Sequence, residues 1–262
     1  EMDGFQMLAW RGLLAGSIFI TLWFITRRGW RAEDIANLKR PFGLGLITCQ
    51  FFNATLFSLG VSIAPVALVL LGVATVPIFA AFFAFIILRE PTETKTWIAI
   101  GSVLCGLSVA VFTPENGHVQ INIWSLLGAL AGLGVAISLS MSFVLIRHQK
   151  TAPFLLAIGI GGLLSGLFGL LMTGLGNMAN GNIGYIIFTG IVILPTSFFL
   201  LSFAARYTHA SNVSLALLLE TVLGPLWVWM GTPERPTPMM LFGGFIVILS
   251  LITYLILMRR QK

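Results

Sequence analysis

The chain of 262 residues is 57% hydrophobic and only 9% charged, with a mean hydropathy of +0.97. Soluble domains carry about 25% charged residues, so a water-soluble fold is excluded. The net charge of +6 would suggest nucleic acid as the partner of a soluble protein, but the basic residues here fall between apolar runs. These runs are about 20 residues long and do not alternate, which predicts an all-α polytopic membrane protein and not a β-barrel.

We predict nine membrane spans. In chain order they are Phe5–Ile25, Pro41–Val61, Val66–Leu88, Trp97–Phe112, Trp124–Ile146, Phe154–Leu175, Ile183–Ala205, Ser211–Met230 and Thr237–Met258. Between the first two spans, the segment Trp30–Arg40 has two interpretations. It is either a short interfacial helix that presents Trp30, Ile35 and Leu38 to the bilayer, or a solvated basic loop.

Basic content alternates between successive loops. All of the Lys and Arg residues except Arg11 and Arg235 fall on one side of the predicted membrane. The positive-inside rule then places that side and the C-terminus in the cytoplasm, which we expect to be that of a bacterial cell, behind its inner membrane. Nine spans put Glu1 outside, and the chain starts without Met or a signal peptide. We therefore expect a preceding first helix to be missing, so that the intact protein has ten.

An internal repeat agrees with ten helices. Ala67–Phe79 aligns with Leu215–Trp227, which places Pro77 against Pro225 and Gly72 against Glu220. A turn with Glu, Pro and Thr and a glycine-bearing apolar helix follow each segment. The pattern predicts two inverted five-helix repeats: residues 1–112 without their first helix, an external linker at 113–123, and residues 124–262. Inverted repeats are a common plan of secondary transporters.

Several motifs carry a resemblance to a known family. Leu8–Gly12 (LAWRG), the Arg-rich turn after that span, the Val66–Glu90 helix with its proline, and Leu217–Trp229 (LLLETVLGPLWVW) together resemble the EamA-type family of the drug/metabolite transporter superfamily. The resemblance implies ten helices in two inverted repeats and secondary transport of small metabolites, often export of amino acids, from a central cavity. The chain departs from the pattern at Thr232–Glu234, where the family usually has Gly before Glu.

Two charged residues lie at membrane depth in this reading. Glu220 is mid-bilayer, where a carboxylate is costly and is by default a functional-site hypothesis. It would bind a cationic group or carry a proton; the alternative is a protonated or hydrogen-bonded carboxyl that holds two helices together. Arg11 would attract a substrate carboxylate, but we favour snorkelling or capping of a helix end.

Prolines and uncharged polar residues supply the other candidates. Pro77, Pro225 and Pro195 are either hinges that line a site or packing kinks. Polar side chains at depth usually bond helix to helix, and we expect substrate contacts among them. The candidate contacts are Gln50, Asn53, Thr75, Ser140 and Thr196. Trp227 is by default an interfacial anchor, and stacking on a substrate is its alternative role.

Glycine pairs at a spacing of four predict close helix packing: Gly12/Gly16, Gly128/Gly132 and Gly162/Gly166. The three histidines form no ligand cluster, and no catalytic constellation lies at depth. We therefore expect no enzyme, no metal and no cofactor. A channel would need a ring of like polar groups, whereas the polar residues here are scattered.

Taken together, the sequence favours a secondary active transporter that works by alternating access. We expect it to export an amino acid or related zwitterion, because an acidic and a basic group would match the two charges of such a substrate. The alternative is an exporter of lipophilic or cationic drugs. The expected partners are the substrate, the lipid bilayer and protons as a coupling ion, with a monomer or homodimer and no nucleic acid.

Overall fold

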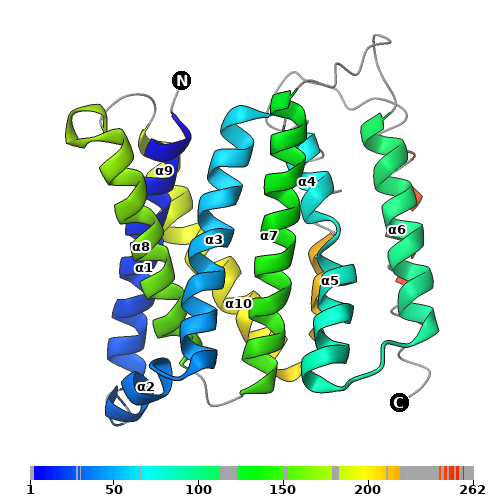
Figure 1. Ribbon diagram of the computed structural model, residues 1–262, viewed down its shortest axis with the longest axis horizontal. Coiled ribbons are helices and arrows are strands. Elements are labelled where there is room, and N and C mark those ends of the chain that lie inside the picture. The colour runs from blue at the N-terminus through cyan, green and yellow to red at the C-terminus, as the bar shows by residue number, and fades with distance from the viewer. Residues whose placement is uncertain are drawn as a thin grey trace.

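The computed structural model is a bundle of helices (Figure 1). It describes residues 3–27, 29, 31–64, 66–112, 123–149, 153–178, 183–210, 212–218, 223, 242, 245–246, 248–250, 252–253 and 256. No strand occurs among these residues, which confirms the all-α prediction. The elements are α1 (Gly4–Thr26), α2 (Arg31–Leu38), α3 (Pro41–Ile63), α4 (Val66–Val73), α5 (Val76–Phe83), η1 (Ala84–Leu88), α6 (Thr94–Phe112), α7 (Ile123–His148), α8 (Phe154–Thr173), η2 (Leu175–Asn177), α9 (Ile183–Phe188), η3 (Thr189–Ile193) and α10 (Leu194–Tyr207).

Five helical stretches are long and apolar enough to cross a membrane. They are Gly4–Thr26, Pro41–Ile63, Leu126–His148, Phe154–Thr173 and Ile183–Tyr207. Each coincides closely with a predicted span, and α6 covers the predicted fourth span. Most of the two predicted spans nearest the C-terminus lies outside the described residues.

The predicted span Val66–Leu88 is interrupted. Helix α4 ends at Val73 and α5 begins at Val76, with Pro77 in its first turn, where a missing N–H is tolerated. Between the two helices, the Thr75 hydroxyl donates to the Gly72 carbonyl at 2.6 Å. The chain then passes through the π-helical turn η1. The proline thus marks a real break, and its role as a hinge stays a prediction.

At Pro195 the helix changes type but is not broken, because the backbone stays helical from Ile183 to Tyr207. Pro195 is buried in the first turn of α10, directly after the second π-helical turn, η3. A π-turn is rare and often lies at functional sites. The two candidate hinge prolines that the structure describes, Pro77 and Pro195, therefore sit beside irregular backbone in the middle of long apolar segments.

Nearly all of the described Lys and Arg residues lie at one end of the bundle, which we call the basic edge. Helices α1, α7 and α10 and the turn η1 end there, whereas α3, α6 and α8 begin there (Figure 1). Every described Lys and Arg except Arg11 lies in these ends or in α2: Arg27, Arg31, Lys39, Arg40, Arg89, Lys95, Arg147 and Arg206. This arrangement agrees with the alternation of basic loops in the sequence.

Helices α1 and α8 pack closely through glycines. A Cβ added to Gly12 would lie 2.6 Å from the Gly162 carbonyl oxygen and 2.6 Å from the Gly166 backbone nitrogen. A Cβ on Gly16 would meet the Leu163 nitrogen at 2.7 Å. No side chain fits between these backbones, so the predicted role of the Gly12/Gly16 and Gly162/Gly166 pairs is confirmed.

The buried apolar core lies in the half of the bundle nearest the basic edge. Its members are Phe19, Trp23, Leu38, Leu46, Val76, Ala80, Ala84, Ala136, Leu139, Phe143, Val144, Leu145, Ile146, Phe154, Leu156, Ala157, Ile158, Ala205, Ala210 and Val213. On every helix these positions fall between the middle of the bundle and the basic edge. We call this cluster the basic-edge core; it closes that half with apolar side chains.

Candidate functional site

A stripe of three residues on α3 turns toward the interior between α7 and α8. Gln50, Asn53 and Phe57 are three and four positions apart, so they share one helix face. Leu56 on one side of the stripe contacts Gly134 of α7, and Gln50 lies against Gly161 of α8. We call Gln50, Asn53 and Phe57 the α3 stripe.

The two amides of the stripe are buried and have no hydrogen-bond partner among the residues that the structure describes. Gln50 is 8% exposed and Asn53 is 6% exposed. Within the described part of the chain neither side chain makes a hydrogen bond, yet neither has a fully enclosed polar atom. A buried amide without a partner is costly, and native proteins rarely leave one so. Amides held ready in this way can bind a polar ligand.

Arg11 joins the stripe from α1. Its guanidinium carbon lies 5.3 Å from the centroid of the Phe57 ring, which is a cation–π distance. The side chain is half-buried and therefore not simply extended toward water. Arg11 thus lies beside the Phe57 end of the stripe, on the same face of α3 as the two amides. A guanidinium can receive a carboxylate.

Ser140 and Thr75 serve another contact. Ser140 is completely buried, and its hydroxyl lies 2.9 Å from the Val76 carbonyl oxygen and 2.6 Å from that of Ala136. It therefore holds the break before α5 against α7, which is the helix-to-helix bond expected of polar groups in a membrane. Thr75 bonds within its own segment. Thr196 is exposed beside the buried Pro195.

Glu220, Trp227 and Pro225 lie outside the described residues, so the structure gives their side chains no position. It does describe Gly72, the residue aligned with Glu220. A Cβ on Gly72 would lie 2.7 Å from the Ala129 carbonyl oxygen and 2.7 Å from the Gly132 carbonyl carbon of α7. The position of Gly72 is therefore filled by helix contact and admits no side chain.

The sequence did not reveal an ion cluster at the basic edge. Glu90 accepts hydrogen bonds from the Arg147 Nη2 at 2.7 Å and the Arg147 Nε at 3.1 Å, and it lies 2.9 Å from the His209 Nδ1. Burial alone would raise the pKa of Glu90, but bonds and charges from Arg147 and His209 lower that pKa below its usual value. The three residues are far apart in sequence, so spacing gave no signal.

A second ion pair fixes α2. Asp34 is 1% exposed and accepts bonds from the Trp23 indole at 2.8 Å and the Arg27 guanidinium at 2.9 Å. Burial opposes ionisation, but Arg27 and Trp23 lower the pKa of this carboxyl. The helical interpretation of the segment Trp30–Arg40 is confirmed, because α2 spans Arg31–Leu38. The prediction that Leu38 faces the bilayer is wrong, because Leu38 packs into the basic-edge core; Trp30 lies outside the described residues.

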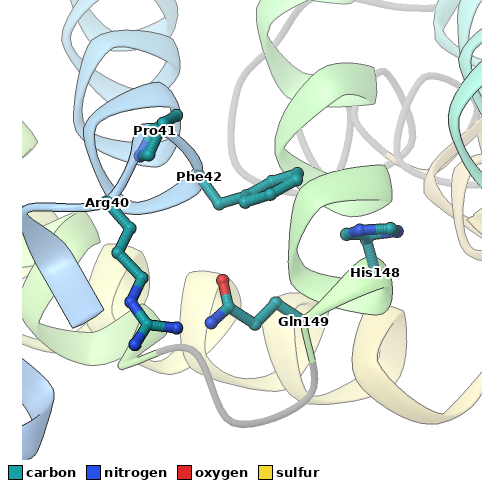
Figure 2. Close-up of a pocket in the computed structure, with 5 residues that line it drawn as sticks. All are labelled: Arg40, Pro41, Phe42, His148 and Gln149. Carbon is teal, nitrogen blue, oxygen red and sulfur yellow. The ribbon is translucent and has the colours of Figure 1, made fainter.

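An open pocket of about 260 Å³ lies at the basic edge, where α3 begins and α7 ends. Figure 2 shows its lining residues: Arg40, Pro41, Phe42, His148 and Gln149. The Phe42 and His148 rings stack with centroids 4.8 Å apart. This pocket lies about two helical turns from Gln50 along α3. No group of three His, Cys, Asp or Glu able to hold a metal ion occurs among the residues the structure describes.

Known proteins resemble this chain in sequence and in fold. The model of the EamA-like transporter family matches residues 1–112. Over 253 residues the chain is 27% identical to an uncharacterized transporter of Bacillus subtilis (strain 168), YdfC, covering 93% of this chain and 79% of that protein. A solved crystal structure matches with a TM-score of 0.79 at 16% identity, covering 99% of this chain and 89% of the other, which shows the fold alone. These matches confirm the resemblance to the EamA-type family found in the sequence. The matching family and the Bacillus subtilis relative are both named as transporters.

Proposed function

We propose that this EamA-type membrane protein is a secondary active transporter that moves a small metabolite by alternating access. The observation that carries the proposal is the α3 stripe, inside a bundle of apolar helices. Its two buried amides have no hydrogen-bond partner among the described residues, and its Phe57 lies against the Arg11 guanidinium. A charged group at membrane depth is expensive and is by default a functional-site hypothesis. The similarity to transporters supports the same conclusion.

The substrate we propose is an amino acid or a related zwitterion, and the proposed direction is export across a bacterial inner membrane. Its carboxylate would bind Arg11 and the amides of the stripe, and its ammonium group would bind Glu220. Protons are the proposed coupling ion, because a carboxyl in a low-dielectric site titrates near neutral pH. An exporter of lipophilic cations is the alternative, although a guanidinium in the site disfavours a ligand that carries only positive charge.

We further propose that the chain forms two inverted repeats and that the basic edge faces the cytoplasm, together with the C-terminus. The packing supports the repeat. In the proposed repeats α1 corresponds to α8, and α3 corresponds to the α9–η3–α10 segment. The contact of α3 with α8 therefore has its counterpart in the contact of η3 and α10 with α1. The positive-inside rule supports the orientation.

The test is uptake by proteoliposomes made from the protein, with a panel of amino acids, organic cations and neutral metabolites. A zwitterion should accumulate only under an imposed substrate or proton gradient. Glu220→Gln and Asn53→Leu should each lower transport at least tenfold, whereas Glu93→Gln, the same charge change at an exposed acid, should not. Flux that ignores both gradients would contradict a secondary transporter. Transport of cations alone would favour the alternative substrate.

A further inference from the structure

We propose that Glu90, Arg147 and His209 form a latch that holds the bundle closed at the basic edge, and that passage of substrate through this edge requires the latch to open. The proposal rests on the alternating-access mechanism proposed above. It adds the elements that separate and the contact that controls their separation.

The latch joins three segments that are distant in sequence. Glu90 follows the end of η1, Arg147 belongs to the last turn of α7, and His209 follows the end of α10. Arg147 grips both carboxylate oxygens of Glu90, with distances between 2.7 and 3.1 Å. The His209 Nδ1 completes the cluster at 2.9 Å from Glu90. In the proposed repeats, Glu90 belongs to the first half and its two partners belong to the second, so the contact ties one half to the other.

The latch lies next to the basic-edge core, at the ends of the helices that contribute to it. Ile146 and Ala210 are the chain neighbours of Arg147 and His209, and both are buried in that core. Ala84, at the start of η1, is a third core member; the Glu90 backbone N–H donates to the Ala84 carbonyl oxygen at 3.3 Å. A backbone movement that carries Glu90 away from its partners would therefore also move Ala84 relative to the core.

The exposure of the cluster suits a contact that opens and closes. The side chains of Glu90, Arg147 and His209 are 30%, 16% and 55% exposed. A fully buried pair would leave stranded charges when it opened, whereas a fully exposed pair would be screened by salt and hold little. In this cluster water can reach each side chain as the partners separate, so no charge is left unsolvated. Along α3, the stripe lies farther from the basic edge than Leu46, the core residue of that helix.

Opening can be measured with a thiol reporter in the core. The native thiols, Cys49 and Cys105, are first replaced by Ser, and Ala84→Cys then supplies one buried thiol. Its alkylation by a water-soluble maleimide is timed on purified full-length protein in detergent. Glu90→Gln should raise the alkylation rate about fivefold to tenfold, because the carboxylate that holds Arg147 is neutralised. Glu90→Asp, which keeps the charge, should restore much of the protection.

Two controls separate opening from loss of structure. Glu93→Gln removes an exposed acid from the same loop and should leave the rate at Ala84→Cys unchanged. Ser165→Cys places a reporter in α8 beside the glycine contacts, where the native side chain is completely buried. Glu90→Gln should leave this second reporter slow. An equal rise at both reporters, or no rise at Ala84→Cys, would overturn the latch.

The latch and the transport function fail separately in this design, since alkylation needs no substrate. Faster alkylation at Ala84→Cys together with no transport of any compound in the panel would keep the latch and count against the transporter. Gradient-driven transport together with unchanged alkylation would support the transporter and overturn the latch.

Discussion

The two halves of the bundle are held together by different means. Near the basic edge, large apolar side chains pack into one core and ion pairs bridge the helix ends. Toward the opposite edge, α1 and α8 touch backbone to backbone at glycines, and polar residues such as Gln6 and Ser165 are buried. Contacts between side chains can separate and form again by changes of rotamer, whereas glycine contacts leave no such freedom. The difference supports the proposal that α1 and α8 stay together as a rigid pair while the bundle opens at the basic edge.

The largest effect is expected at the rigid pair. Gly166→Ala would place a methyl group 2.5 Å from the Leu13 backbone nitrogen, so α1 and α8 must move apart. We expect the free energy of unfolding in mixed micelles to fall by about 1–3 kcal/mol. Gly101→Ala in α6 is the matched control, because nothing lies within 4 Å of its added Cβ, and it should be neutral or slightly stabilising. Equal losses in the two variants would contradict the rigid pair.

The next effect is expected at α2. Asp34→Asn removes the charge that Arg27 and Trp23 bind, and we expect a loss of about 1–3 kcal/mol in the same unfolding measurement. Glu33→Gln changes the charge of the exposed neighbouring residue and should cost much less. A similar cost for both would mean that only the net charge of α2 matters.

The basic edge should also be sensitive to acid. Because Arg147 and His209 lower the pKa of Glu90 in the folded protein, its ionised form contributes stability that is complete above the ordinary carboxyl pKa of 4.5. This contribution, about 1 kcal/mol for a partly exposed pair, is lost as the pH falls through the lowered folded value. Unfolding curves from pH 7 down to pH 3 should show it, and Glu90→Gln should remove this part of the slope. An unchanged slope in that variant would assign the acid sensitivity to other carboxyls.

The smallest effect on stability is expected at the α3 stripe. Asn53→Leu and Gln50→Leu remove amides that have no partner in the described part of the chain, so stability should stay within about 1 kcal/mol of the parent or rise. Ser140→Ala removes the hydrogen bond from the Ser140 hydroxyl to the Val76 carbonyl and should lower the free energy of unfolding by about 1 kcal/mol. The stripe variants should instead weaken substrate binding in the uptake assay. A clear loss of stability would show that the amides serve the fold.

Periodicity and loop charge were sufficient to predict the long helices that the structure describes, the basic edge and the contacts of Gly12, Gly16, Gly162 and Gly166, because apolar length, charge and small side chains act locally. The break before α5 was also predictable from Pro77, since proline lacks an N–H. The interfacial helix was only half predictable. Its apolar residues suggested contact with lipid, but the buried Asp34 rotates Leu38 into the core instead.

The ion cluster could not be predicted in the same way. Glu90, Arg147 and His209 each read as ordinary loop charges, and only the fold brings residues separated by 57 and 119 positions together. The site was partly predictable: Gln50 and Asn53 share a face by spacing alone, but the contact of Arg11 with Phe57 on that face depends on how α1 crosses α3. Ser140 was chosen for its hydroxyl, and the structure shows that hydroxyl bonded to a backbone carbonyl.

The π-turn η1 has an evolutionary consequence. A π-turn holds one more residue than an α-turn, and it reads as a single inserted residue in an otherwise regular helix. Deleting one residue within Ala84–Leu88 would therefore close the wide turn to an α-turn and leave the chain on both sides in place. Arg89, which ends the turn in the left-handed region at φ 54°, and Glu90 would keep their positions. A change of length that the turn does not absorb would instead rotate Glu90 by about 100° and shift it by about 1.5 Å, away from Arg147. The π-turn is thus the place where this segment can lose one codon and still keep its contact with α7.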